Sequence, residues 1–119
     1  MGQAKDAVGA YGERVAARRL VEDGLELLDR NWRCAAGEID IVARDGPVIV
    51  FCEVKTRRSA TFGPPVEAVT PAKVRRLRSL AAAWLAEHPL VRGPVRFDVV
   101  SVWPQRSGPA IVDHLREAF

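Results

Sequence analysis

Apolar and polar residues follow helical spacing in two segments of the chain. Residues 4–23 carry Ala, Val and Leu at spacings of three and four, contain no proline and end before Gly24, which predicts a helix. A second helix is predicted from an N-cap at Thr70 to His88, with Pro71 at the first helical position.

Other segments have the alternation or composition of strands: residues 25–34, 37–44, 47–56, 95–103 and 110–115. The first is interrupted by charges, which is typical of an exposed edge strand. The second and third flank Asp45-Gly46, a dipeptide that favours a tight hairpin. Residues 57–65 contain glycine and two prolines and are expected to form a loop.

The order helix, three strands, helix, two strands predicts an α/β fold with a central mixed sheet flanked by helices. A right-handed crossover through the second helix would make the strand at 95–103 parallel to the one at 48–56. At 119 residues the chain has the length of one domain, so we expect a single domain over residues 1–119.

Composition limits the classes of protein that fit. The apolar and charged fractions, 48% and 28%, are those of a folded globular chain. No uncharged apolar run reaches the roughly 20 residues of a membrane span, and no secretory signal is recognisable, so we expect a cytoplasmic protein without a membrane partner. Cys34 and Cys52 are then expected to be reduced packing residues.

The register of the hairpin decides which side chains share a face. With Asp45 and Gly46 as the loop, Asp40 lies opposite Phe51. Side chains alternate along a strand, so four charged residues project together from one face, at the end away from the turn. These residues are Glu38, Asp40, Glu53 and Lys55.

Three carboxylates on one face repel one another unless a cation binds between them. Oxygen ligands without His or Cys suit Mg²⁺, with Mn²⁺ as a substitute, and the two histidines are expected to lie outside the site. Asp40, Glu53 and the main-chain carbonyl of Val54 would hold the ion, which would polarise a phosphoryl oxygen and acidify a water. The alternative is a buried structural ion-pair cluster.

Lys55 would orient the attacking water and meet charge that develops on the phosphate. The chain has 18 lysines and arginines, of which only Lys5, Lys55 and Lys73 are lysines, so a lysine in an apolar strand needs an explanation. Burial near a metal is expected to depress the pKa of Lys55, which a permanently charged arginine does not allow.

Asp40, a gap of twelve residues and Glu53-Val54-Lys55 resemble the PD-(D/E)xK signature of the restriction-endonuclease-like superfamily, with Ile39 where the signature has proline. Five blocks in the same order resemble the YraN family of small bacterial proteins: Gly12-Glu13, Gly37-Glu38-Ile39-Asp40, Glu53-Val54-Lys55, Phe62-Gly63 and Arg96-Phe97-Asp98-Val99-Val100. The resemblance implies a restriction-endonuclease-like fold and a candidate nuclease site.

The resemblance also suggests roles for residues outside the hairpin. Related resolvases place a glutamate of the first helix near the metal and work as dimers, so Glu13 is a candidate member of the site and a homodimer is compatible with the sequence. Glu13 would otherwise make a helix-dipole contact. Glu38 is either an additional metal ligand or a rim residue paired with an arginine. For Asp98, alternation with Arg96 on one strand favours a structural ion pair.

Cations near the predicted site are candidates for phosphate binding. The second helix directs Arg75 and Arg76 away from its apolar stripe and has Lys73 at the margin, while Arg57 and Arg58 follow Lys55. Phe62 would stack on an unpaired base or anchor the loop. A solvated basic helix face is the alternative.

These patterns together predict a metal-dependent phosphodiesterase that acts on nucleic acid, with DNA as the favoured substrate. Two alternatives remain: a nucleic-acid-binding module that is catalytically silent without a partner, and a structural adaptor that binds neither metal nor nucleic acid. The net charge of +3 is too small to choose among them.

Overall fold

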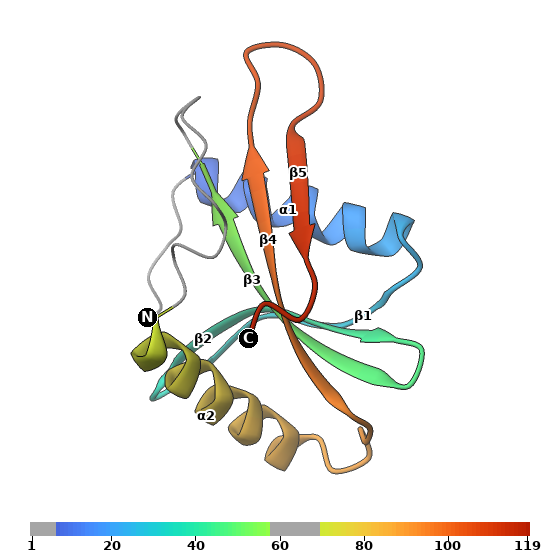
Figure 1. The fold of residues 1–119 in the computed structure, drawn as a ribbon, viewed down its shortest axis with the longest axis vertical. Helices are drawn as coiled ribbons and strands as arrows, with labels where there is room; N and C mark the ends of the chain where they lie inside the picture. The colour runs from blue at the N-terminus through green and yellow to red at the C-terminus, as the bar shows by residue number, and fades with distance from the viewer. Residues whose placement is uncertain (1–6, 58–69) are drawn as a thin grey trace.

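A five-stranded mixed sheet lies between two helices in the computed structural model, which describes residues 7–57 and 70–119 (Figure 1). The elements in chain order are α1 (Ala7–Glu22), β1 (Glu26–Cys34), β2 (Gly37–Asp45), β3 (Val48–Thr56), α2 (Pro71–Glu87), β4 (Val95–Trp103) and β5 (Ile111–Leu115).

The strands follow the order β1-β2-β3-β4-β5 across the sheet. Only the β3–β4 pair is parallel, because the chain passes through α2 between these two strands, whereas the other three pairs are antiparallel. This arrangement confirms the predicted α/β class, the mixed sheet flanked by helices and the order helix, three strands, helix, two strands.

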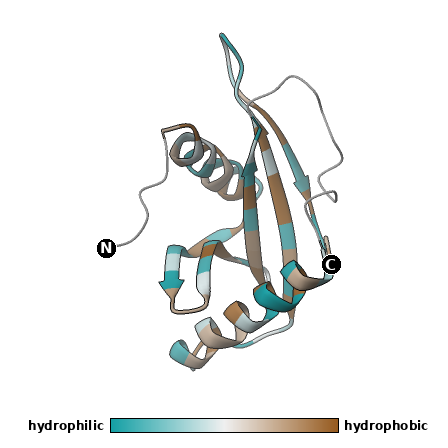
Figure 2. Cartoon of the chain, turned by 90° about the vertical axis from the view of Figure 1, so that its left-hand side faces the viewer, coloured by the Kyte–Doolittle hydropathy of each residue, from teal (hydrophilic) through white to brown (hydrophobic). Residues whose placement is uncertain are grey.

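The two helices cover opposite faces of the sheet. Ala16, Ala17 and Leu20 of α1 pack against one face, and Leu80 and Trp84 of α2 pack against the other. The strands between them are largely hydrophobic (Figure 2). Each helix therefore has its own apolar core, and the sheet separates the two.

The start of α2 is set by its cap, as the sequence predicts. The Thr70 side chain accepts the N–H of Lys73 at 3.1 Å, and Pro71 occupies the first helical turn. Lys73 therefore has a fixed backbone position one turn into the helix, directly above the end of the sheet where it contacts β3.

The hairpin between β2 and β3 turns at Gly46-Pro47, one residue later than predicted. Phe51 therefore lies opposite Val42 and not opposite Asp40. Gly46 has a φ of 59°, and the ring of Pro47 holds its own φ near −65°, a combination that fits a type II′ turn and excludes the type I′ turn expected for Asp-Gly. The register differs by two residues, so every side chain keeps its predicted face.

Gly12 lies where α1 comes closest to β3. A Cβ at this position would lie 2.9 Å from the Cβ of Thr56 and would overlap its hydroxyl. We therefore expect Gly12→Ala to lower the free energy of unfolding by about 1–3 kcal/mol in urea denaturation, although alanine is the better helix former. Adding Thr56→Ala should recover part of the loss; equal stability of Gly12→Ala and wild type would contradict this packing.

Composition predicts two further features: the chain has no membrane-spanning segment, and its two cysteines are reduced. In the described parts of the chain, no helix is long and apolar enough to cross a bilayer. Cys34 and Cys52 are both free thiols, and Cys52 is buried in the core beneath α1, as expected for packing residues.

Candidate active site

An open pocket of about 320 Å³ lies beside the first turns of α2, beyond the last paired residues of β2 and β3. Its charged lining residues are Glu38, Asp40, Glu53, Lys55, Lys73 and Arg76. The pocket therefore brings together the four charged side chains that the hairpin alternation placed on one face, and adds two cations from α2.

Asp40 is held at the pocket by the main chain of β3, because its Oδ2 accepts the N–H of Val54 at 2.8 Å. The N–H groups of Ile49 and Arg57 donate on the β4 side of the strand. Peptide groups of a strand point alternately to its two neighbours, so those of Val54 point towards β2. The Val54 carbonyl therefore opens on the same side as Asp40, where the sequence predicts a third oxygen ligand.

Glu53 is largely enclosed at the pocket, with 13% of its side chain exposed. Its Oε2 lies 3.2 Å from the ammonium of Lys55 and also contacts the ammonium of Lys73. Two cations thus meet at one carboxylate oxygen.

The two ammonium groups have opposite pKa shifts. Burial lowers the pKa of Lys55, but the hydrogen bond with the Lys73 nitrogen and the charges of Glu53 and Asp40 outweigh burial, so the net pKa is raised. Burial and the adjacent Lys55 lower the pKa of Lys73. The depression predicted for Lys55 supposes a bound metal beside it and stays a prediction; with the protein groups alone, the pKa of Lys55 is raised.

Glu38 lies at the rim of the pocket, opposite Arg33 of β1. The Nε of Arg33 is 3.4 Å from Oε2 of Glu38. This contact agrees with the alternative expected for Glu38, a rim carboxylate paired with an arginine.

The predicted phosphate-binding residues divide into two groups. Lys73 and Arg76 line the pocket, whereas Arg75 is exposed on α2 and does not. Arg57 directly follows β3, with its Nε and Nη2 buried and without a hydrogen-bond partner among the described residues. Arg58 and Phe62 lie outside the described residues.

Glu13 does not line the pocket. It is 6% exposed on the sheet-facing side of α1, and α1 covers the face opposite to α2. The close approach of Gly12 to Thr56 places this turn of α1 beside the end of β3, one residue beyond Lys55.

The oxygen ligands of the pocket fit a small hard cation. In the described residues, no three His, Cys, Asp or Glu side chains lie close enough to hold a metal without other ligands. Mg²⁺ does not need such a cluster, because it retains several waters and binds proteins through one or two carboxylates. Asp40, Glu53 and the Val54 carbonyl provide that number of ligands at one pocket.

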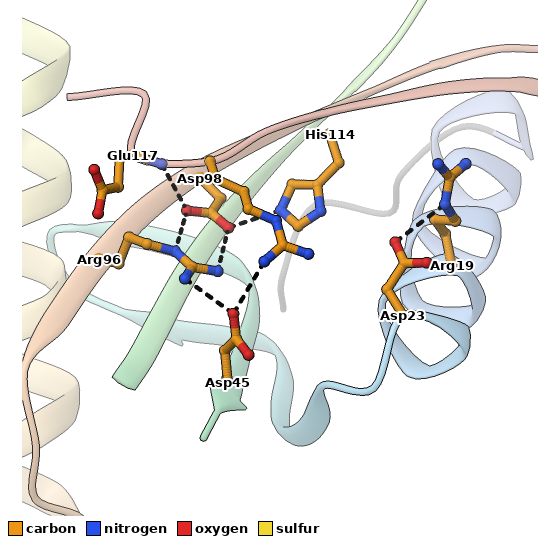
Figure 3. A network of polar contacts seen from close by, with 8 residues as sticks. Arg19, Asp23, Asp45, Arg96, Asp98, His114 and Glu117 are labelled. Carbon is orange, nitrogen blue, oxygen red and sulfur yellow. Dashed lines mark hydrogen bonds and ion pairs between the residues drawn. The ribbon is translucent and has the colours of Figure 1, made fainter. Parts of the chain in front are cut away.

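A second polar cluster surrounds Asp98 of β4, which is completely buried (Figure 3). Its carboxylate accepts hydrogen bonds from Arg96 Nε at 2.9 Å and from the Glu117 N–H at 3.1 Å, and lies 2.7 Å from His114 Nε2. Arg96 Nη1 also contacts Asp45 at 3.0 Å. The predicted structural ion pair of Asp98 is confirmed; the sequence did not predict that His114 and the C-terminal residues complete it.

The pKa of Asp98 reflects these partners. Burial raises the pKa of Asp98, but the hydrogen bonds from His114, Arg96 and the Glu117 N–H together have the larger, opposite effect. The net pKa is therefore below the ordinary value of an aspartate. None of these residues lines the pocket at α2. The Asp98 cluster therefore joins β4, β5 and the C-terminal segment, and its role is structural.

Comparison with known proteins places the chain among small bacterial proteins. The model of "Uncharacterised protein family UPF0102" matches residues 12–102. A UPF0102 protein of Kineococcus radiotolerans is 62% identical over 114 residues, covering 95% of this chain and 93% of the relative, and one of Beutenbergia cavernae is 61% identical, covering 96% and 97%.

A solved structure shows a weaker similarity to this chain. Pyrococcus furiosus SfsA, determined in complex with Ca²⁺, has 15% sequence identity and a TM-score of 0.42, and the match covers 91% of this chain and 61% of that chain.

Proposed function

The chain belongs to the uncharacterised protein family UPF0102, which confirms its resemblance to YraN proteins, and we propose that it is a metal-dependent nuclease that hydrolyses phosphodiester bonds in nucleic acid, with DNA as the favoured substrate. One observation carries the proposal: Asp40, Glu53 and Lys55 converge on one open pocket, beside cations of α2. Carboxylates and a lysine in this arrangement supply the ligands and the charge that hydrolysis of a phosphodiester requires.

Asp40 and Glu53, with the Val54 carbonyl, would hold Mg²⁺ or Mn²⁺, and Glu38 would add a carboxylate at the rim. The bound ion would supply Lewis-acid polarisation of the phosphate and lower the pKa of a water. The hydrogen bond from the Val54 N–H keeps Asp40 directed at this position. Glu13 remains a predicted member of the site, acting from the turn of α1 beside the end of β3.

Lys55 would position the water and stabilise negative charge on the phosphate. An ammonium at this position can donate hydrogen bonds to a phosphate oxygen, which suits charge stabilisation. Its side chain is 34% exposed, so a phosphate at the pocket mouth would reach it without rearrangement of the sheet.

Phosphates on either side of the cleaved bond would contact the neighbouring cations. Arg76 and Lys73 line the pocket, Arg75 is exposed beside them on α2, and Arg57 has two buried nitrogens, Nε and Nη2, without a partner among the described residues. Such contacts make binding salt-dependent and do not depend on sequence. A homodimer would provide a second pocket for the second strand of a duplex.

The test is a cleavage assay on linear duplex, single-stranded and branched DNA with Mg²⁺ or Mn²⁺. We expect cleavage that EDTA abolishes and that Glu53→Gln lowers at least about 100-fold, because the variant loses a charged ligand. Glu87→Gln, the same substitution at an exposed position in the last turn of α2, should cleave like wild type. Equal activity of Glu53→Gln and Glu87→Gln would disprove the proposed site.

A second candidate function is nucleic-acid binding without cleavage. The contact of Glu53 with both Lys55 and Lys73 favours it, because a carboxylate neutralised by two ammonium groups is a weaker metal ligand. Salt-dependent DNA binding, with no product in the presence of either metal ion, would support this alternative over the nuclease.

A further inference from the structure

We propose that Lys73 is an internal counter-ion of Glu53 that competes with the divalent cation and moves to a substrate phosphate when the cation binds. The inference rests on the proposed function, since it concerns the same pocket. Lys73 thereby has a positioning role, because its ammonium moves between Glu53 and a substrate phosphate. The basic face of α2 alone would predict only a general phosphate contact.

The first observation is an excess of positive charge at one oxygen. Lys55 and Lys73 both contact Oε2 of Glu53, whose side chain is 13% exposed. The two ammonium groups share one carboxylate oxygen, and like charges repel strongly where water is partly excluded. A further cation at Glu53 would therefore displace one of the two lysines.

The second observation identifies Lys73 as the lysine that leaves. Lys55 belongs to the same strand as Glu53, two residues further along β3, whereas Lys73 reaches Glu53 from another element, across the pocket. Its backbone is fixed by the Thr70 cap, so only its four-carbon side chain has to move. Arg76, one turn further along α2, lines the same pocket and marks the direction in which a phosphate would lie.

The first test measures Mn²⁺ binding to the full chain without DNA, by the electron paramagnetic resonance signal of free Mn²⁺. We expect Lys73→Met and Lys73→Gln to bind Mn²⁺ about tenfold more tightly than wild type, because the competing ammonium is gone, and Lys73→Arg to show no such gain. Arg92→Met removes one positive charge from an exposed loop and controls for net charge, so its affinity should equal that of wild type.

The second test follows the release of Lys73 to phosphate. A fluorescein-labelled DNA duplex is titrated at several NaCl concentrations, with Ca²⁺ or with EDTA, and the slope of log K against log salt is compared. With Ca²⁺, the slope for wild type should be steeper than the slope for Lys73→Met by the amount that about one phosphate contact contributes. With EDTA, the two slopes should agree.

The outcomes separate this inference from the proposed function. Equal Mn²⁺ affinities of wild type and both neutral Lys73 variants would overturn the inference, and would leave the nuclease proposal standing if Glu53→Gln still weakens Mn²⁺ binding. Mn²⁺ binding that neither Glu53→Gln nor Asp40→Asn changes would overturn both. Slopes that differ equally in Ca²⁺ and EDTA would show that Lys73 contacts phosphate without exchanging, and would also overturn the inference.

Discussion

Replacing Lys55 by methionine is expected to lower the rate of DNA cleavage by about 10²- to 10⁴-fold, the range for loss of a group that stabilises charge or transfers a proton in the transition state. The ammonium lies 3.2 Å from Glu53 at the pocket, where a phosphate would bind. Methionine is unbranched like lysine and nearly as long, and it removes the charge together with the three N–H donors. The rate should be measured in single-turnover assays with saturating Mg²⁺.

Binding and folding should change little in the same variant. The Lys55 side chain is 34% exposed, so methionine neither opens a cavity nor buries a new polar group, and the melting temperature should stay within a few degrees of wild type. DNA affinity, measured by anisotropy in Ca²⁺, should fall by a few-fold at most because several other cations remain. Cleavage by Lys55→Met at the wild-type rate would show that the lysine serves only as an ion pair of Glu53.

The largest expected effect on stability is at Asp98. We expect Asp98→Ala to lower the free energy of unfolding at pH 7 by about 3–5 kcal/mol, because removal of one partner leaves Arg96 charged and largely buried in the cluster. Arg96 retains Asp45, at 3.0 Å, as its remaining carboxylate. Urea denaturation gives the difference directly, provided that the slope of the transition is unchanged.

Two further variants separate charge from packing. Asp98→Ala combined with Arg96→Met removes both charges and should be more stable than Asp98→Ala alone. Asp113→Ala removes an exposed aspartate of the adjacent strand β5 and should change stability by less than about 0.5 kcal/mol. Equal loss in Asp98→Ala and Asp113→Ala would contradict a structural role for the cluster.

The pH dependence of this difference has a defined sign. The pKa of Asp98 is lowered in the folded protein, so its carboxylate stabilises the fold above the ordinary aspartate pKa, about 3.9. This contribution is lost as the pH falls through the lower pKa of the folded state. The stability difference between wild type and Asp98→Ala should therefore narrow below about pH 4.

The elements of this protein follow from local rules that act within a few residues. The Thr70 cap with Pro71 determines where α2 begins, and strand alternation places Asp40, Glu53 and Lys55 on one face. The incorrect turn position did not disturb this conclusion, because a shift of two residues preserves the side-chain faces.

Interactions between elements that are distant along the chain were not predictable in this way. Whether Lys73 contacts Glu53 depends on how α2 packs over the end of the sheet, after a connection that includes residues 58–69. His114 reaches Asp98 because β5 pairs with β4, and Glu117 reaches it because the residues after β5 lie beside β4. Periodicity and capping specify local conformation and faces, whereas these contacts, and the pKa values that depend on them, arise from packing in three dimensions.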